Sequence, residues 1–379
     1  MPSGGNEKGK APRLHEVEVS VFGTGFGESI VVHLGLDRWI VIDSCKNPNS
    51  KRPVALEYLN QIGVNIPERV LLVVATHWDD DHIGGLAEVF TFAEKAVFAC
   101  PATVNYDEFK QILATVTGTR HLPGGSGADE MFEIMKELGK RGSRYPTPKL
   151  AVVHKDLLEI CDTLPVRVQA LSPSDADIVS AIERLRRVPQ LAEGPPRLRL
   201  PRFESNDASV VISIQFGQRE LILLGADLEE RGLLAVGWQA VVEGWPSGRG
   251  KHSVFKVAHH GSSNGHLDAA WDQLLKESPW AIVTSFSFGK INLPTKTDCQ
   301  RISDRTKRGM ITSHPSRSRY KDRMPAIRRT IDEVARSAYV VRAKEGHVRL
   351  RRDLETTSDW ICERFGSAIP IDPALIASL

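Results

Sequence analysis

Residues 77–85 read His77-Trp78-Asp79-Asp80-Asp81-His82-Ile83-Gly84-Gly85, which places four potential metal ligands, His77, Asp79, Asp81 and His82, within six residues. The apolar run at residues 71–75 predicts a buried strand before this stretch, and residues 83–90 predict the start of a helix after it. The ligands are therefore expected in a strand-to-helix loop. Because a helix N-terminus favours negative groups, the loop suits carboxylates and phosphates, and it indicates a metal site of the kind that hydrolases use.

Two later segments repeat this arrangement of an apolar strand that ends in metal-binding side chains. Residues 220–224 lead to Asp227, and residues 254–258 lead to His259 and His260. Taken alone, an aspartate at a strand end is more often a turn or cap residue, and a histidine pair is more often structural. Three such strands in one chain favour a single metal site, because the ends of distant strands can meet at one edge of a sandwich.

The composition is that of a globular protein. The chain has 379 residues, of which 41% are hydrophobic and 25% charged, enough for one large domain or two ordinary ones. No apolar run approaches the roughly 20 residues of a membrane-spanning helix, and residues 1–8 lack the apolar segment of a signal peptide. We therefore expect a cytoplasmic protein that does not enter a membrane. The five cysteines are widely spaced and predict neither disulfides nor a cysteine-based zinc site.

Positive charge is concentrated in residues 286–352. This basic region has 18 lysines and arginines against six acids, although the net charge of the whole chain is only +2. Such a density attracts polyanions through counterion release, which favours nucleic acid as a substrate, while a solvated helical surface is an equally acceptable alternative. Tyr320 is the main aromatic residue among these charges, so contacts with phosphates are favoured over base stacking.

The order of the predicted elements indicates an α/β protein. Residues 1–14 are expected to form a flexible N-terminal tail, and residues 353–379 a C-terminal extension that packs on the domain or on a partner. The domain between them, residues 15–352, is expected to include a helical insert at 102–150 and the basic region at 286–352. Besides the three strands above, the pattern predicts strands at 16–22, 29–34, 39–43, 149–153, 166–171, 209–216 and 281–285, and helices at 56–62 and 131–138.

The sequence also resembles the metallo-β-lactamase fold, and within it the group similar to the soluble hydrolase domain of the DNA-uptake protein ComEC. The usual loop of the fold, His-x-His-x-Asp-His, reads His77-x-Asp79-x-Asp81-His82 here, which is similar to a variant in the ComEC-type group. The other matches are Gly25-Phe26-Gly27-Glu28-Ser29 leading to Asp43, residues 168–173, Asn206-Asp207-Ala208-Ser209, residues 224–227 and residues 256–262. The resemblance covers about residues 16–350 and implies an αββα sandwich, in which two mixed β-sheets are flanked by helices.

The resemblance implies a site for two divalent metal ions. It assigns His77 and Asp79 to one ion, Asp81, His82 and His259 to the other, Asp227 to both, and Asn206 or Asp207 to the first, directly or through water. Because Asp79 replaces an imidazole with a hard oxygen ligand, the ions, manganese or zinc, are expected to shift toward manganese. Asp43 is expected to hold the loop by accepting an N–H bond.

The same resemblance implies hydrolysis by a metal-activated water. Asp81 would orient this water and accept its proton, and His260 would donate a proton to the leaving oxygen or bind phosphate, unless it only holds a ligand carboxylate. Asn206, Ser262 and Lys256 are expected to bind the substrate. Together with the basic region, this predicts a nuclease or phosphodiesterase, restrained by a regulatory protein partner.

One alternative is a hydrolase of a small lactone, thioester or cyclic nucleotide, which an enclosed pocket formed by the insert would favour. The other is a nucleic-acid-binding subunit with a degenerate metal site.

Overall fold

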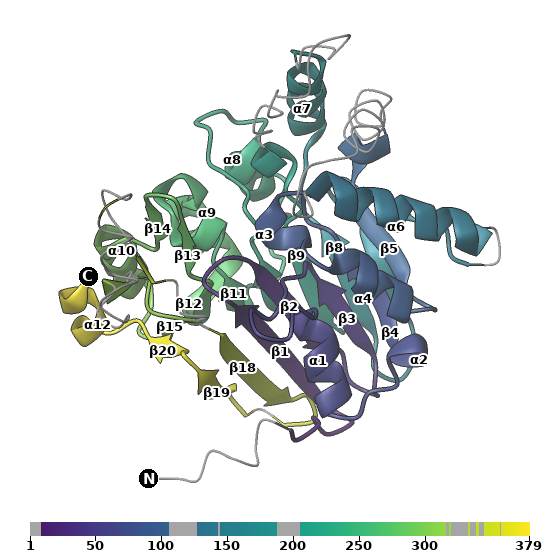
Figure 1. Cartoon of the computed structure of the whole chain (residues 1–379), viewed down its shortest axis with the longest axis horizontal. Coiled ribbons are helices and arrows are strands. Elements are labelled where there is room, and N and C mark those ends of the chain that lie inside the picture. Colours follow the sequence, from purple (N-terminus) through teal and green to yellow (C-terminus); the bar gives the residue numbers. More distant parts are fainter. Residues whose placement is uncertain are drawn as a thin grey trace.

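The computed structural model describes residues 9–105, 127–142, 145–187, 205–315, 318–319, 333, 339–340, 345–356 and 358–379. Its centre consists of two mixed sheets of eight strands each (Figure 1). In spatial order the first sheet contains β19 (Ile361–Gly366), β18 (Gly346–Asp353), β1 (Glu16–Gly23), β2 (Glu28–His33), β3 (Trp39–Ile42), β4 (Val70–Val74), β5 (Val97–Pro101) and β6 (Lys149–Ala151). The second contains β20 (Ile369–Pro370), β15 (Gly309–Ile311), β12 (Leu275–Val283), β11 (His252–Lys256), β10 (Arg219–Leu224), β9 (Ile212–Phe216), β8 (Val166–Ala170) and β7 (Asp156–Ile160).

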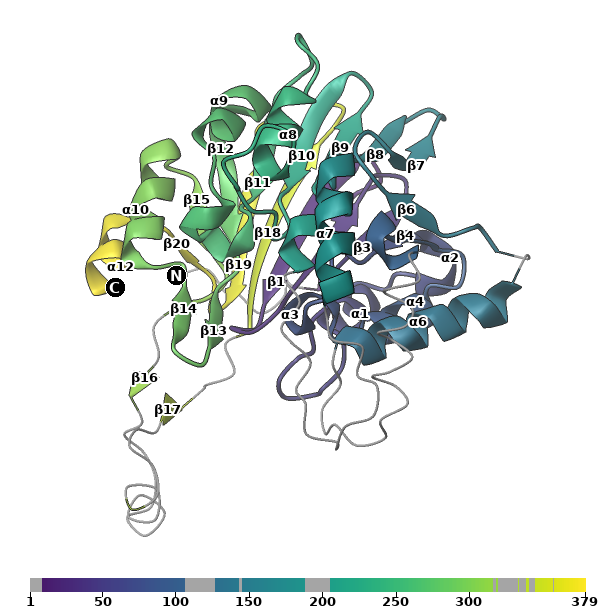
Figure 2. The same cartoon turned by 90° about the horizontal axis from the view of Figure 1, so that it is seen from above.

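Helices lie on the outer sides of the two sheets, as Figure 2 shows from above. On the side of the first sheet are α1 (Val54–Gln61), α2 (Ile66–Arg69), α3 (Asp80–Ile83), α4 (Leu86–Phe92) and α6 (Gly127–Arg141). On the side of the second are α8 (Gly237–Glu243), α9 (Asp268–Leu274), α10 (Lys296–Arg305) and α12 (Pro373–Ser378), while α7 (Asp175–Arg187) packs against Ala102. The remaining strands form the hairpin of β13 (Phe286–Phe288) and β14 (Ile291–Leu293) and the pair of β16 (Ser318–Arg319) and β17 (Tyr339–Val340).

The layers follow from the alternation of side chains along the strands. In β1, Val17, Val19 and Val21 belong to the apolar core between the two sheets, and Phe22 points the other way, into the core under α1 and α4. A third core lies between the second sheet and α8, α9, α10 and α12. Three apolar cores between four layers of secondary structure confirm the expected αββα sandwich.

Some parts of the chain differ from the expectation. Residues 353–379, predicted as an extension, add β19 to the first sheet and β20 to the second. The helix predicted from residue 83 is two short helices, α3 and α4, because Gly84 and Gly85 separate them and Gly85 adopts a φ of 87°. Of the predicted tail, insert and basic region, residues 1–8, 106–126, 143–144 and most of 316–344 lie outside the described residues. Among the helices that the structure describes, none is both long and apolar enough to cross a membrane.

Candidate metal centre

Strands of both sheets end at one edge of the sandwich, and the candidate ligands follow those ends. β3 and β4 are parallel neighbours in the first sheet, and β10, β11 and β12 are parallel neighbours in the second. His77 follows β4, Asp227 follows β10 and His260 follows β11. The two edges are joined where the N–H of Val210 donates to the carbonyl oxygen of Thr76 at 3.0 Å. Side chains from distant parts of the sequence therefore meet at one place.

Three buried imidazoles at this place share one orientation, in which Nδ1 contacts a neighbouring group and Nε2 faces the centre. Nδ1 of His82 lies 2.7 Å from a carboxylate oxygen of Asp43, and Nδ1 of His77 and of His260 lie 2.9 Å and 3.0 Å from threonine hydroxyls. Nε2 of His82 is 3.2 Å from Oδ1 of Asp227, and Nε2 of His260 is 3.1 Å from Oδ2 of Asp81. Metal-binding histidines are held in this manner, because a partner on one ring nitrogen fixes the other for the ion.

Asp43 ties the metal loop to the first sheet. Its Oδ1 accepts the backbone N–H of Thr76, and its Oδ2 accepts both the Thr76 hydroxyl and Nδ1–H of His82, all at 2.7 Å. Asp43, His77 and His82 are close enough to surround an ion, but both oxygens of Asp43 already accept hydrogen bonds. The expectation that Asp43 holds the loop by accepting an N–H bond is confirmed.

Several buried polar atoms at the centre have no hydrogen-bond partner among the described residues. They are Nε2 of His77, Nε2 of His82, Oδ1 of Asp227 and Oε1 of Glu28. The His82 and Asp227 atoms of this set are in ion-pair contact at 3.2 Å but do not form a hydrogen bond. Such atoms are rare, because leaving each one unpaired costs about 1–3 kcal/mol. Glu28, His82, Asp227 and His260 can each offer a ligand atom within 4.8 Å of the others. Imidazole nitrogens and carboxylate oxygens bind divalent cations, so the residues present fit such an ion.

The pKa shifts show an excess of negative charge at this centre. Burial opposes protonation of His82, yet the carboxylates of Asp227 and Glu28 raise the pKa of its imidazole well above the ordinary value. Burial would raise the pKa of Asp81, but His82 and His260 lower it to about 2. Protons on His82 and His260 therefore balance the carboxylates, whereas burial lowers the pKa of His77 well below the ordinary value. A metal ion would have to displace these two protons, because imidazole binds metal only when neutral.

The backbone is unusual where the strands deliver these side chains. Asp43, Ala226, His259 and His260 all have left-handed conformations, with φ of 56°, 45°, 47° and 51°. Left-handed backbone at non-glycine residues costs on the order of 1–3 kcal/mol and is found preferentially at functional sites. The left-handed conformations set the directions of the ligands, and no pattern in the sequence indicates them.

The two adjacent histidines point to different places. His260, expected to be a proton donor, is the one whose Nε2 contacts Asp81. His259, expected to be a ligand, lies beside the centre, with Nε2 3.5 Å from Nδ2 of Asn206 and Nδ1 3.3 Å from Oε1 of Glu229. The left-handed backbone at both residues directs the ring of His260 toward Asp81 and Asp227, and the ring of His259 toward Glu229.

Two predicted ligands lie at the margin of the centre. Oδ2 of Asp79 is 4.0 Å from Nε2 of His77, and the side chain of Asp79 is 36% exposed, so it lies at the rim. Asp207 is buried away from the other ligands and pairs with Arg184 and, at 3.6 Å, with Arg231. Of the Asn206-Asp207 pair, only Asn206 therefore lies beside the centre.

Lys256 was expected to bind the substrate, but its position in the structure is inaccessible to one. Its side chain is fully buried, and its ammonium group lies 2.6 Å from Oε2 of Glu28. Ser262 is half-buried in the turn after His260, and its N–H donates to the carbonyl oxygen of His259 at 2.8 Å. Glu28 had no predicted role, and it reaches the centre because it begins β2, which runs antiparallel to β3. The segment Gly25-Phe26-Gly27-Glu28-Ser29 that matches the resemblance includes Glu28, but the resemblance assigned it no role at the centre.

Most described arginines of the basic region pair with acids. Arg301 pairs with Asp298, Arg305 with Asp268 and Asp272, Arg308 with Asp359, Arg349 with Glu363, and Arg351 with Glu18. Most of these acids lie outside residues 286–352, so the sequence count did not include them. Lys290 and Lys296 are exposed. The local positive charge of the described part is therefore smaller than the count indicated.

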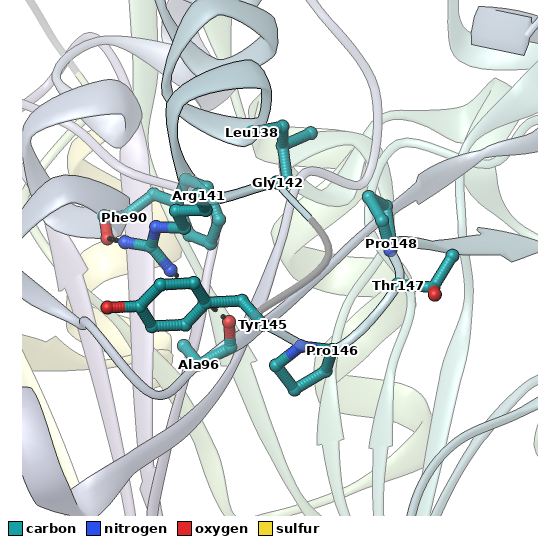
Figure 3. A pocket seen from close by; sticks show the side chains of 9 residues that line it. All are labelled: Phe90, Ala96, Leu138, Arg141, Gly142, Tyr145, Pro146, Thr147 and Pro148. Carbon is teal, nitrogen blue, oxygen red and sulfur yellow. Dashed lines mark hydrogen bonds between the residues drawn. The ribbon is translucent and has the colours of Figure 1, made fainter.

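A cavity lined partly by the predicted insert does not belong to the metal centre. It has a volume of about 250 Å³ and is lined by residues of α4, α6 and the segment 145–148. Figure 3 shows Arg141 against the rings of Phe90 and Tyr145, and its guanidinium donates to the carbonyl oxygens of Ala93 and Glu94 at 3.2 Å and 3.1 Å. None of the candidate ligands lines this cavity, so it does not favour a small-molecule substrate at the metal centre.

Comparisons with known proteins give weak likenesses. No protein-family model matches the sequence, and no curated protein does. One similar solved structure is Igni18, described as a novel metallo hydrolase from the hyperthermophilic archaeon Ignicoccus hospitalis, with 14% identity, a TM-score of 0.37 and coverage of 76% of this chain and 91% of that one. Another is a metallo-β-lactamase from Pontibacter korlensis, with 16% identity, a TM-score of 0.25 and coverage of 57% and 72%. At these TM-scores the overlap of folds supports no functional conclusion, and the narrower resemblance to ComEC stays a prediction.

Proposed function

We propose that the protein is a metal-dependent hydrolase of phosphodiesters, with nucleic acid as its substrate. The observation that carries the proposal is the convergence of buried Nε2 atoms and carboxylate oxygens without hydrogen-bond partners. The resemblance of the loop to that of ComEC-type hydrolases and the remaining positive charge of the basic region support phosphodiesters over uncharged esters.

In this proposal His77 and Asp79 hold one divalent ion, and Asp81, His82 and His260 hold a second, with Asp227 between them. The set differs from the sequence-based one in the exchange of His259 for His260. Bound divalent cations supply Lewis acidity for hydrolysis of a phosphodiester. The oxygen ligands, Asp79 among them, favour manganese more than an all-imidazole site would.

The remaining groups of the chain would orient the water and move the protons. The side chain of Asp81 is 12% exposed at the centre, so its carboxylate can orient a water and accept a hydrogen bond from it. His259 is 18% exposed beside the centre, and the carboxylate of Glu229 at 3.3 Å orients its ring. His259 is therefore placed to donate a proton to the leaving oxygen, while the Asn206 amide beside it can bind a phosphate oxygen.

Assays of the purified protein with manganese or zinc, on single- and double-stranded DNA and RNA and on small lactones and thioesters, test this function. We expect cleavage of nucleic acid. His260→Ala should lose both bound metal and cleavage, whereas His259→Ala should keep the metal and lose about 10²-fold or more in turnover. Cleavage of small esters alone would contradict the proposal. Binding of nucleic acid without cleavage under any metal would instead favour a binding subunit.

A further inference from the structure

Three phenylalanines beside the metal centre form a surface that the sequence did not indicate. Phe26 lies in the turn between β1 and β2, and Phe286 and Phe288 belong to β13. The ring of Phe26 is 5.6 Å from that of Phe286 and 5.5 Å from that of Phe288, measured between centroids. Phe26 is 39% exposed and Phe288 is 50% exposed. We call these three residues the aromatic platform.

The aromatic platform is joined to the metal centre on two sides. The ring of Phe286 stacks on that of His260, with centroids 5.0 Å apart and planes 27° apart. The β1–β2 turn approaches the metal loop so closely that a Cβ atom on Gly27 would lie 3.0 Å from the carbonyl oxygen of Asp81. The N–H of Ser287 donates to a carbonyl oxygen of that turn at 2.8 Å, and Figures 1 and 2 show the hairpin next to it. The platform therefore begins directly beside two proposed ligands.

We propose that the aromatic platform stacks the unpaired base next to the scissile phosphate, which makes single-stranded nucleic acid the substrate. This inference rests on the proposed function. The faces of paired bases are covered by their neighbours, whereas unpaired bases stack on exposed aromatic rings. Phenylalanine offers no hydrogen bond to a base edge, so the platform is expected to accept any base.

The surroundings of the platform favour a nucleotide over an acyl chain of a lipid. Lys290, in the hairpin turn two residues after Phe288, is exposed. Positive side chains beside flat rings are the combination that single-strand-binding proteins use for backbone and base. An acyl chain can bind to any apolar side chain, whereas a base stacks only on an aromatic ring. A substitution that keeps the apolar character but removes the ring therefore distinguishes the two ligands.

Replacement of Phe288 separates these contacts, because its exposed ring can be changed without opening the core. Phe288→Leu keeps an apolar side chain, Phe288→Tyr keeps the aromatic face, and Phe92→Ala, which removes a ring that is 46% exposed on α4, is the matched control. The substrates are a short oligothymidylate and an abasic oligomer of the same length. We expect Phe288→Leu to raise KM for oligothymidylate about tenfold, and to leave its kcat and the KM of the abasic oligomer unchanged. Phe288→Tyr and Phe92→Ala should behave like the wild type.

Equal effects on both oligomers, or no effect on either, would overturn the inference. Loss of binding to phosphatidylglycerol vesicles in Phe288→Ala but not in Phe288→Leu, without a change in KM, would assign the platform to lipid and also overturn it. If the wild-type protein cleaves duplex DNA or RNA but neither oligomer, the inference fails and the proposed function stands. If it cleaves no nucleic acid at all, the proposed function fails, and fluorescence anisotropy still decides on the platform. Tenfold weaker binding of oligothymidylate by Phe288→Leu would then support base stacking, and equal binding would exclude it.

Discussion

Two buried polar clusters contact the first sheet: the metal centre and a second cluster around Glu18, called the outer cluster. They differ in whether their buried carboxylates are paired with other groups of the chain. The outer cluster lies between β1, β18 and α1. There, Oε1 of Glu18 accepts hydrogen bonds from Tyr58 at 2.5 Å and from Ser20 at 2.7 Å, and Oε2 accepts Nε–H of Arg351 at 2.8 Å. The nearby Arg349 pairs with Glu363 at 2.8 Å. Each carboxylate here is matched by a cation or a hydroxyl from the same chain.

The metal centre has the opposite arrangement. Carboxylates of Glu28, Asp81 and Asp227 converge with imidazoles, Lys256 supplies a fixed positive charge, and several lone pairs face inward without partners. Burial of charge is costly unless it is paired. The carboxylates of the outer cluster are paired within the chain, whereas the metal centre offers ligand atoms that a divalent cation would fill. The difference separates a cluster that stabilises the fold from one that is arranged to bind an ion.

The largest effect is expected at Asp227, the proposed bridging ligand. Asp227→Asn keeps the shape but removes the charge, so the protein should lose bound metal and its rate of cleavage should fall by on the order of 10³. Elemental analysis and kcat/KM on the same preparation check both effects, with circular dichroism as the control for folding. Full metal content with full activity would show that the cluster is not the catalytic centre.

In the outer cluster the expected loss is in stability. Glu18→Ala leaves the buried guanidinium of Arg351 without its carboxylate and should lower the free energy of unfolding by about 3–5 kcal/mol. Cleavage per folded molecule should not change. Urea denaturation followed by fluorescence measures the loss, and the double variant Glu18→Leu/Arg351→Met should recover part of it. A loss below about 1 kcal/mol would mean that this pair is not buried in solution.

A smaller effect is expected at Asp43, which shares a feature with each cluster. Both of its carboxylate oxygens accept hydrogen bonds, as in the outer cluster, and it holds the proposed ligand His82 of the metal centre. Asp43→Asn replaces the charged acceptor of His82 Nδ1–H by a neutral amide. We expect metal affinity to fall about 10- to 100-fold, with binding stoichiometry unchanged. Isothermal titration with manganese measures both. Loss of a whole equivalent of metal would make Asp43 a ligand instead.

The comparison also shows what the sequence could predict. The strands of the inner core could be predicted because their apolar runs are continuous or alternate, as in Val17, Val19 and Val21 of β1. β19 could not, because it is an edge strand whose residues are mostly exposed or half-buried and show no apolar face. The metal loop could be predicted because its ligands are neighbours in the chain. Glu28 lies in a matched segment, but its place at the centre depends on the pairing of β2 with β3, which its position in the sequence does not indicate.

The difference between the expected and the proposed roles of His259 and His260 has another cause. Two adjacent histidines carry no signal for which ring faces inward, and the left-handed backbone at both residues decides it. Likewise, Phe26 in the β1–β2 turn and Phe288 in β13 are distant in sequence, so the aromatic platform forms only because the hairpin lies against that turn. Both features depend on tertiary contacts, which periodicity does not encode.

The smallest expected effect is on the pH dependence of stability, and it comes from His252, a buried histidine whose pKa is shifted in the opposite direction to that of His82. Burial lowers the pKa of His252 to about 4, against the raising effect of its hydrogen bond with the Leu274 carbonyl oxygen, whereas carboxylates raise the pKa of His82. Below a pH of about 6.5 the unfolded chain binds a proton that the folded His252 does not, so the free energy of unfolding should fall by on the order of 1 kcal/mol between about pH 7.5 and pH 5.5. His252→Gln should remove this part of the slope in urea denaturation, while His33, whose pKa is also lowered to about 4, should keep its own share. An unchanged slope in the variant would mean that His252 titrates normally in the folded protein.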